Sequence, residues 1–394
     1  MTDTTSKSVP TVWLVGLGLA SMLVPINSTM IAVALPDIAD DFAIAKGATG
    51  LLVTVYLVVM LVGQPVAGRL ADRFGSRRMI LGALVGFAVC SVAASFATSF
   101  LLLVVGRVAQ ALFGAVLMPV SRGLIRLVTP VNERGRNFGF QEALFGLGAA
   151  TGPLIGGLVI GVGGWPAVFL VNVPIAACAL ILIRRISADE TTNERGGTER
   201  STIGVVLRER SFVVPFITHA AAVLAQYSLL LTVPIVLDGR GWSSTEVGSA
   251  LILLTVGMVV AGPVGGRIGD VQGRRRPVVT GIMVGVVGVG MAAAAIESNP
   301  QIVLAAMAIF GVGFGLAVPN LTTSALDSVP THLVGSASGA WSMSRYVGSI
   351  PASVVFASMI GDGTSGAQAL LILATAAMIL AVVASSQIKQ VAAA

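Results

Sequence analysis

The sequence predicts an all-α membrane protein with twelve transmembrane helices in two pseudo-symmetric six-helix bundles. Hydrophobic residues make up 55 % of the 394 residues and charged residues only 11 %, whereas a soluble domain carries about 25 % charge. Mean hydropathy is +0.92, and apolar runs of about 20 residues, long enough to cross a bilayer as helices, recur from end to end. One basic loop sequence also occurs twice, about half a chain apart.

The predicted spans follow one another with no room for a soluble domain. Helices are favoured over barrel strands because a barrel would show alternating segments of about ten residues. The polar segment 185–211 is interpreted as a cytoplasmic linker between an N-terminal bundle, 1–184, and a C-terminal bundle, 212–394. In chain order the spans are residues 11–34, 49–70, 78–97, 100–126, 137–160, 166–184, 212–236, 246–266, 277–296, 302–324, 336–358 and 366–386.

The positive charges indicate how these spans are oriented. If the N-terminus is cytoplasmic, twenty of the 24 Lys and Arg residues fall on the cytoplasmic side. Lys46 and Arg240 fall outside, and Arg107 and Arg345 lie within spans. This positive-inside bias predicts that both termini are cytoplasmic. The net charge of +6 is therefore a topology signal, and we expect a lipid bilayer but no nucleic acid as a partner.

The repeated loop relates the two halves. GRLADRFGSRR at Gly68–Arg78 returns as GRIGDVQGRRR at Gly266–Arg276, an offset of 198 positions (266 − 68). With six spans each, the halves have the same orientation and are related by an axis along the membrane normal. Further matches at an offset of 200 pair Pro119, Pro130, Gly135 and Gly139 with Pro319, Pro330, Gly335 and Gly339.

Several motifs accompany this loop. Span four contains Arg107-Val-Ala-Gln110, span eleven contains Arg345-Tyr-Val-Gly348, and span one contains INSTMIAVALP at Ile26–Pro36. Together with the loop, they resemble the drug:proton antiporter branch of the major facilitator superfamily over the whole chain. Span five carries the antiporter motif of that branch at Gly148, Gly152, Pro153, Gly156 and Gly157, and Trp165, Phe169, Asn172 and Pro174 match its pattern entering span six.

The resemblance implies a secondary active exporter of small amphiphilic molecules, drug-like compounds or metabolites, that exchanges them for protons by alternating access. It implies a multi-pass protein of the bacterial inner membrane, and we expect a monomer. No nucleotide loop or metal-ligand cluster stands out in the sequence, so we expect neither enzyme activity nor a cofactor or metal. A transport-inactive sensor or assembly partner is the alternative from another class.

Two residues depart from the family pattern. Asn27 stands where span one usually carries an Asp, and Ala111 stands where Gly usually follows the Gln of span four. The first change puts proton coupling in question. It leaves open a facilitator, a non-proton-coupled exchanger, or a flippase for lipid or lipid-linked substrates.

Asp72 is the centre of a predicted conformational latch, together with Gly68, Arg73 and Gly75. A carboxylate near the membrane surface can cap the N-terminus of a neighbouring helix, where the helix dipole is positive. Span eleven begins near Ser336 on the same side. We expect the equivalent Asp270 to matter less, because Val271 replaces Arg73 in its loop.

Two buried charges are candidates for proton coupling. Arg107 lies in an apolar helix, which costs at least ~2.5 kcal/mol on insertion scales, so it is expected to have a partner or a water-filled cavity. Asn27 falls at a similar depth; the alternative is that Arg107 bonds backbone carbonyls. Glu142 is the only clear carboxylate within the N-terminal spans. It either titrates or forms a structural pair with Arg122.

Arg345 is a second buried cation, with no acid of the C-terminal half obviously at its depth. Trp341 lies one turn earlier on roughly the same face, so the two residues either bind a flat or anionic ligand or simply pack. We expect neutral or anionic substrates to be preferred over quaternary cations. The predicted substrate-binding residues are Asn27, Met30, Arg107, Gln110, Tyr227, Trp341 and Arg345.

Overall fold

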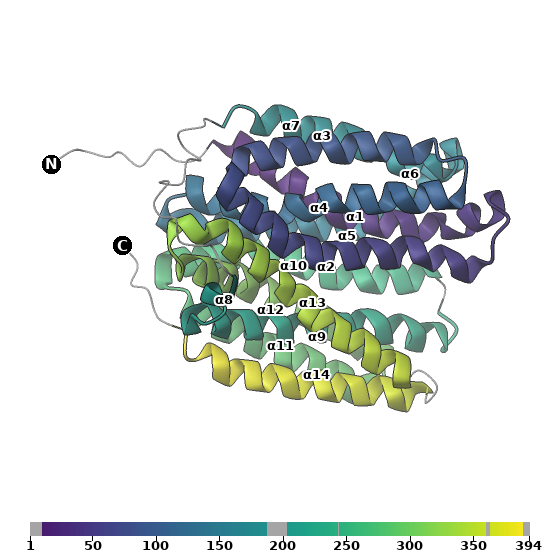
Figure 1. Ribbon diagram of the computed structural model, residues 1–394. Helices are drawn as coiled ribbons and strands as arrows, with labels where there is room; N and C mark the ends of the chain where they lie inside the picture. The colour runs from purple at the N-terminus through teal and green to yellow at the C-terminus, as the bar shows by residue number, and fades with distance from the viewer. Residues whose placement is uncertain (1–9, 187–202, 243, 360–362, 389–394) are drawn as a thin grey trace. The chain divides into compact units, whose positions relative to one another are not determined.

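Long helices make up nearly all of the described chain in the computed structural model, which describes residues 10–186, 203–242, 244–359 and 363–388 (Figure 1). Most of the predicted linker, residues 187–202, lies outside the described residues. The helical fold class predicted from hydropathy is confirmed. Because a helix pairs its backbone groups within itself, it is the form that a long apolar segment takes in lipid.

The first half contains six long helical segments. The side chain of Ser99 caps the fourth by accepting a hydrogen bond from Leu102 N at 3.3 Å, as short polar residues commonly do at helix starts. The elements are α1 (Thr11–Asp41), η1 (Lys46–Thr49), α2 (Gly50–Phe74), α3 (Ser76–Ser95), α4 (Phe100–Val128), η2 (Val131–Glu133), α5 (Arg134–Gly163), α6 (Pro166–Leu170) and α7 (Asn172–Ile183).

The second half repeats this arrangement after a short helix. Asn299 caps α12 by accepting hydrogen bonds from Gln301 N (3.0 Å) and Ile302 N (3.4 Å), and Pro300 occupies the first turn. The elements are α8 (Ile203–Val206), α9 (Arg210–Asp238), α10 (Ser244–Gln272), α11 (Arg275–Ala295), α12 (Pro300–Asp327), η4 (Thr331–Leu333), α13 (Val334–Met359) and α14 (Gly363–Ser385).

The duplicated loops make the same turn. Gly75, between α2 and α3, has a φ of 91°, and Gly273, between α10 and α11, has a φ of 87°. Such left-handed backbone is strained for residues with a Cβ, which explains the glycine at both positions. The two copies of the loop therefore share their backbone conformation at this glycine as well as their sequence.

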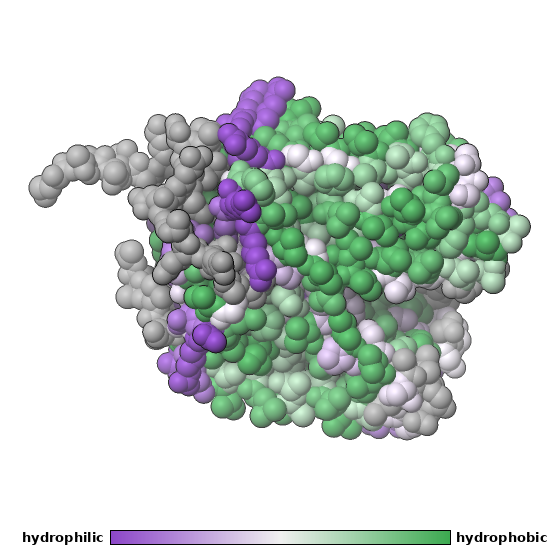
Figure 2. Space-filling view, in the orientation of Figure 1, coloured by the Kyte–Doolittle hydropathy of each residue, from purple (hydrophilic) through white to green (hydrophobic). Residues whose placement is uncertain are grey.

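Within the described residues, eleven helices are long and apolar enough to cross a membrane. Figure 2 shows hydrophobic residues over much of the visible face. Val62, Leu101 and Val105 are among the large hydrophobic residues that are exposed. The predicted eleventh span, α13, is 26 residues long but is not among the eleven, because serines recur along it and lower its hydropathy. The count of twelve spans and the position of the termini stay predictions.

Two compact units emerge from the contacts within the chain. Unit 1 comprises Met1–Pro130, Leu144–Ile203 and Pro330–Ser342, and unit 2 comprises Val131–Ala143, Gly204–Val329 and Met343–Ala394. Each unit therefore consists of most of one predicted half and a short segment from the other. The first part of α5 packs in unit 2, and the first part of α13 packs in unit 1. The predicted bundles 1–184 and 212–394 stay a prediction.

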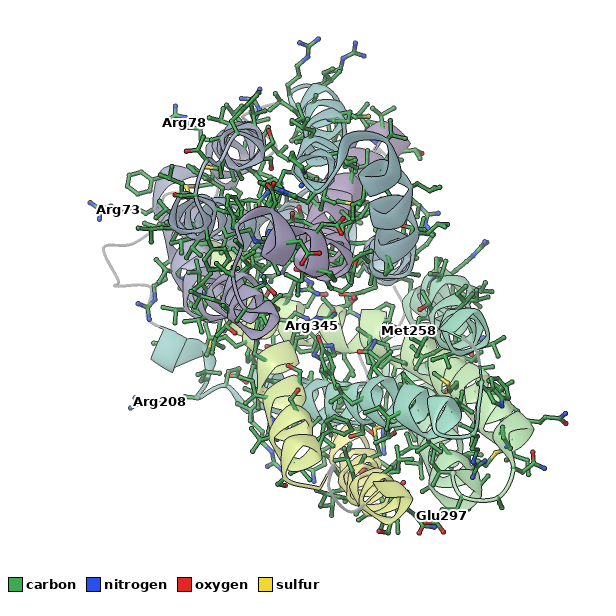
Figure 3. All side chains as sticks on the ribbon, turned by 90° about the vertical axis from the view of Figure 1, so that its right-hand side faces the viewer. Arg73, Arg78, Arg208, Met258, Glu297 and Arg345 are labelled. Carbon is green, nitrogen blue, oxygen red and sulfur yellow. The ribbon has the colours of Figure 1, made fainter. Side chains whose placement is uncertain are left out.

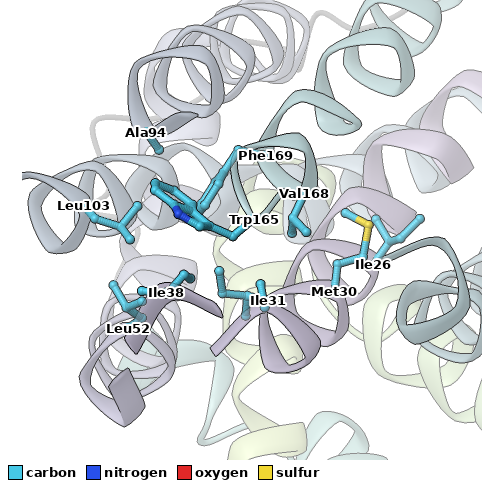
Figure 4. Packing of buried hydrophobic residues seen from close by; sticks show 11 residues of the cluster. Ile26, Met30, Ile31, Ile38, Leu52, Ala94, Leu103, Trp165, Val168 and Phe169 are labelled. Atoms are coloured by element: carbon cyan, nitrogen blue, oxygen red, sulfur yellow. The ribbon is translucent and has the colours of Figure 1, made fainter. Parts of the chain in front are cut away.

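Buried hydrophobic residues of unit 1 form a cluster (Figure 4). It joins α1, α2, α4 and α6 through Ile31, Leu52, Leu103 and Val168, all of which are fully buried. Trp165 closes the cluster and donates from Nε1 to Asp41 Oδ2 at 2.9 Å. This packing fixes the helices that carry the polar residues described next.

Candidate functional site

Asp72 caps the first turn of α13. Its Oδ1 accepts the backbone N–H of Gly335 at 2.7 Å, and its Oδ2 accepts the N–H and the hydroxyl of Ser336 at 2.8 and 2.7 Å. These bonds satisfy groups that a helix N-terminus leaves unpaired, and they place the carboxylate at the positive end of the dipole. The predicted cap is confirmed; its role as a conformational latch stays a prediction.

Gly68 brings α2 into close contact with the same turn. A Cβ at this position would meet the carbonyl oxygen of Gly335 and would lie 3.1 Å from Cα of Gly339. Backbone meets backbone here, so no side chain can move aside to make room. Gly68 is therefore a structural requirement of the cap, because a larger residue would push Asp72 away from α13.

The arginines of the loop do not take part in the cap through their side chains. Arg73 and Arg78 are exposed and point away from the helices of unit 1 (Figure 3), and the guanidinium of Arg73 lies over the ring of Phe74 at 5.4 Å. Arg77 donates to the carbonyl oxygen of Arg184 at 2.8 Å, just after α7. A cation at that end complements the helix dipole.

Unit 2 contains an equivalent cap. The two carboxylate oxygens of Asp270 accept the backbone N–H groups of Gly135 and Arg136 at the start of α5, each at 2.8 Å. Arg73 takes no part in the first cap, so its replacement by Val271 is not a reason for a weaker second cap. The expectation that Asp270 matters less than Asp72 stays a prediction.

An ion triad strengthens the second cap. Asp327, at the end of α12, receives Arg134 Nη1 at 2.6 Å and Arg274 Nη2 at 2.7 Å. The first cap has no arginine at the matching repeat positions. Val334 stands where the repeat places Arg134 (334 − 134 = 200), and Ser76 stands where it places Arg274 (274 − 76 = 198). The two caps therefore share their backbone geometry but differ in the charges around them.

A chain of buried side-chain hydrogen bonds crosses the interior of unit 1. Asn172 Nδ2 donates to Asn27 Oδ1 (3.1 Å), and Asn27 Nδ2 donates to Gln110 Oε1 (3.2 Å). The same Gln110 oxygen accepts Arg107 Nη1 at 2.7 Å, and Gln110 Nε2 donates to Ser91 Oγ at 2.7 Å. All five residues are fully buried. Asn27, Arg107 and Gln110, predicted as binding residues, thus lie together.

Aromatic rings enclose the guanidinium of Arg107. Its Cζ lies 4.3 Å from the ring centre of Tyr56 and 6.0 Å from that of Phe169. The quadrupole of an aromatic face attracts a cation, by roughly 0.5–2 kcal/mol. Arg107 bonds an amide side chain rather than backbone carbonyls. The alternative in which it ties carbonyls together therefore finds no support among the described contacts.

Glu142 and Arg345 form an ion pair in unit 2. Arg345 Nη2 lies 3.3 Å from Glu142 Oε2, and the side chains are 13 % and 7 % exposed. No acid of the C-terminal half is expected at the depth of Arg345, and the acid that pairs with it comes from the N-terminal half, from the first part of α5, which packs in unit 2. Arg122 Nη1 donates to Ser342 Oγ at 3.0 Å in unit 1; its predicted pairing with Glu142 stays a prediction.

The other predicted binding residues lie in different surroundings. Met30 is fully buried in the hydrophobic cluster of unit 1 (Figure 4). Trp341 is fully buried in the unit 1 part of α13, whereas Arg345 belongs to the unit 2 part. Tyr227 is half-buried on α9. Binding roles for these residues stay predictions.

The glycines of the antiporter motif line one face of α5. A Cβ at Gly148 would lie 2.7 Å from Met22 Cγ, one at Gly152 would meet the Thr29 hydroxyl, and one at Gly156 would lie 3.3 Å from the Met30 backbone. These residues repeat every four positions and so share a face against α1. Gly157 has nothing within 4 Å. The first three glycines therefore let α5 approach α1 closely.

Sequence reasoning missed three contributors. Ser91 and Tyr56 join the Arg107 network from α3 and α2, and Asp327 holds the ion triad. A lone Ser or Tyr in an apolar helix carries no signal of its partner. Asp327 had one, because an acid at the end of a span beside several arginines indicates an ion pair.

Comparison with known proteins agrees with this architecture. The family model of the Major Facilitator Superfamily matches residues 17–353. Together with the two repeated caps and the apolar helices, that match defines a multi-pass membrane transporter rather than an enzyme. The chain belongs to the Major Facilitator Superfamily.

The sequence is similar to those of several proteins named for transport or drug resistance. The chain is 28 % identical to the tetracenomycin C resistance and export protein of Streptomyces glaucescens, covering 90 % of this chain and 77 % of that protein. It is 26 % identical to the multidrug resistance protein Stp of Mycobacterium tuberculosis (88 % and 75 % covered). It is also 26 % identical to the riboflavin transporter RibZ of Clostridioides difficile (79 % of each).

Solved structures share the fold at low sequence identity. The human organic anion transporter MFSD10 superposes with a TM-score of 0.75 over 96 % of this chain and 100 % of that chain, at 15 % identity. The proton:xylose symporter XylE gives a TM-score of 0.77 at 15 % identity, covering 96 % of each chain. At this identity the likeness concerns the fold alone.

Proposed function

We propose that the chain is a secondary active exporter of small amphiphilic molecules, coupled to proton entry by antiport. The names of two relatives, a tetracenomycin C resistance and export protein and a multidrug resistance protein, support export. The close packing of α5 on α1 at Gly148, Gly152 and Gly156 supports it too, because these residues match the antiporter motif. We place the protein in the bacterial plasma membrane as a monomer, with both termini in the cytoplasm.

The buried pair of Glu142 and Arg345 is the observation that carries proton coupling. A carboxylate 7 % exposed and 3.3 Å from a guanidinium has two alternative partners, the arginine and a proton. Protonation of Glu142 would remove the attraction and free Arg345, which changes what the site can bind. Antiport needs such an exchange, because binding of the proton must oppose binding of the substrate. Asn27, where the family carries an acid, leaves Glu142 as the proposed carrier.

Transport by the purified protein in liposomes tests this proposal. Vesicles would be loaded with tetracenomycin C or riboflavin, the compounds named for two relatives, and the flux followed with and without an imposed pH gradient. We expect a flux that needs the protein, depends on the gradient and stops when a protonophore collapses it. A flux that is equal with and without the gradient would reject proton coupling.

A facilitator or non-proton-coupled exchanger is the second candidate. The network of Asn27, Gln110 and Asn172 favours it, because none of these side chains titrates. This candidate predicts rapid counterflow of labelled substrate at uniform pH with no response to a gradient. The same vesicles, prepared with fluorescent lipids, test for a lipid flippase. Absence of every flux would favour the sensor or assembly role.

A further inference from the structure

Two hydrogen-bond donors of the Arg107 guanidinium are unpaired among the described residues. Nη1 donates to Gln110 Oε1, but Nε and Nη2 have no hydrogen-bond partner among the described residues. Arg107 is 0 % exposed, so water in bulk does not satisfy these groups either. A buried donor without an acceptor is unfavourable, and more so when it carries a charge.

The surroundings of Arg107 also leave its charge unbalanced. The side chains linked to it through hydrogen bonds, Asn27, Gln110, Asn172 and Ser91, are all neutral. No acid pairs with Arg107 among the ion pairs of the described residues, and the rings of Tyr56 and Phe169 lie close to its guanidinium. The interior of unit 1 therefore holds a positive charge with free donors and no counter-charge.

We propose that Arg107 is a binding site for a monovalent anion, namely the carboxylate or similar anionic group of the transported amphiphile. This inference rests on the proposed exporter function and adds its substrate class. Nε and Nη2 form the edge of the guanidinium that binds two oxygens of one carboxylate. The rings of Tyr56 and Phe169 beside the guanidinium offer an apolar surface for the rest of the molecule. Arg107 is fully buried in this structure, so entry of the anion requires the surrounding side chains to move.

Asn27 is central to the specificity of this site. Asn27 Nδ2 and Arg107 Nη1 donate to the same oxygen of Gln110, so the two residues are close neighbours. An aspartate at position 27 would bring a permanent internal counter-charge that competes with the anion. The amide leaves the arginine available. Asn27→Asp is therefore expected to weaken binding of anions without removing any donor of Arg107.

The decisive experiment compares two probes of one shape that differ in charge. Binding of 1-naphthoate and of 1-naphthamide to the purified full chain in neutral detergent would be measured by isothermal titration calorimetry. We expect the carboxylate to bind at least tenfold more tightly. Arg107→Gln should abolish that preference, and Asn27→Asp should reduce it at least fivefold. Arg78→Gln is the matched control, because it removes one positive charge at an exposed position (Figure 3), and should leave the preference unchanged.

Protein stability offers a second measurement that does not depend on the probe. If Arg107 lacks a counter-charge, Arg107→Gln and Asn27→Asp should both raise the thermal unfolding midpoint in a buffer free of halide and of anionic amphiphiles. If Arg107 were a structural residue, Arg107→Gln would lower the midpoint. The Asn27→Asp variant keeps the test decisive even if Arg107→Gln fails to fold.

Inorganic halide is the other source of a monovalent anion, and a separate arm identifies it. The unfolding midpoint would be compared in sodium chloride and sodium gluconate at equal ionic strength. A chloride-dependent rise that Arg107→Gln removes, without a naphthoate preference, supports the anion site and assigns it to halide. Equal binding of both probes together with no chloride effect, in the wild type, overturns the proposal. Export of neutral compounds in liposomes with that result would leave the exporter function standing.

Discussion

Ser336 binds Asp72 twice, through its backbone N–H at 2.8 Å and through its hydroxyl at 2.7 Å. The cap therefore depends on a side chain that α13 supplies as well as on its backbone. The contact joins residues 264 positions apart and fixes the start of α13 to the end of α2. Its loss would free both helices at once.

Asp72→Asn should impair transport without preventing membrane insertion. The amide keeps one acceptor oxygen but loses the charge that the helix dipole stabilises. Caps of this kind contribute about 1 kcal/mol, which corresponds to roughly a fivefold change in a conformational equilibrium. The measurement is the transport rate per amount of inserted protein in vesicles. Asp37→Asn, an exposed acid on α1, is the control. Wild-type rates in a well-inserted Asp72→Asn variant would refute the latch.

Asp270→Asn should impair transport less than Asp72→Asn. Both carboxylates accept two backbone N–H groups at the start of a helix. The ion triad on Asp327 is expected to hold the second cap partly in place after the substitution, whereas the first cap has no such support. The double variant Asp270→Asn/Asp327→Asn should therefore lose more activity than the two single losses combined. Simple additivity in the same vesicle assay would count against this coupling.

Gly152→Ala should reduce both thermal stability and transport, whereas Gly157→Ala should change neither by much. A Cβ at Gly152 meets the Thr29 hydroxyl and the Ile26 carbonyl, but one at Gly157 meets nothing within 4 Å. Overpacking of a close contact costs typically 1–3 kcal/mol, while an exposed Gly→Ala change in a helix adds up to about 1 kcal/mol of stability. Unfolding midpoints of the purified variants give the comparison. Equal midpoints would show that α1 and α5 separate easily.

Glu142→Gln should abolish efflux driven by a pH gradient and spare counterflow exchange. Glutamine keeps the size of the side chain and an acceptor for Arg345, but it cannot carry a proton. Glu133→Gln is a suitable control, because Glu133 pairs with Arg136 on the surface at 3.3 Å. Gradient-driven efflux by Glu142→Gln at the wild-type rate would eliminate Glu142 as the proton carrier.

Local chemistry allowed part of this site to be predicted from the sequence. The Asp72 cap could be predicted because an acid at the end of one span and a helix start on the same side are both visible in the sequence. The equivalence of the loops at Gly75 and Gly273 could be predicted because the loop sequence is repeated. In each case the signal lies in residues that stand close together in the chain or at a fixed repeat distance.

The pair of Glu142 and Arg345 could not be predicted from the sequence in this way. Depth along a helix axis can be counted from the sequence, but the direction in which a helix leans cannot. The first part of α5 leaves its own half and packs in unit 2, which brings residues 203 positions apart into contact. Likewise, the hydrogen bonds that Gln110 accepts from Asn27 and donates to Ser91 depend on the rotation of three helices, which apolar sequences of this composition do not specify.

The exchange of segments between the two units also constrains how the chain is made. Gly135 leaves the ribosome 135 residues before Asp270, its capping partner, and Asp72 precedes Gly335 by 263. At a synthesis rate of about 5–20 residues per second, the start of α5 is made on the order of ten seconds before the carboxylate that caps it. The interval between Asp72 on α2 and the helix start that it caps is longer. Unit 1 is complete only when Ser342 has been synthesised. A nascent chain stopped at the linker would therefore hold an unfinished first unit, so a truncation before Ser342 removes part of the unit that contains the N-terminal helices.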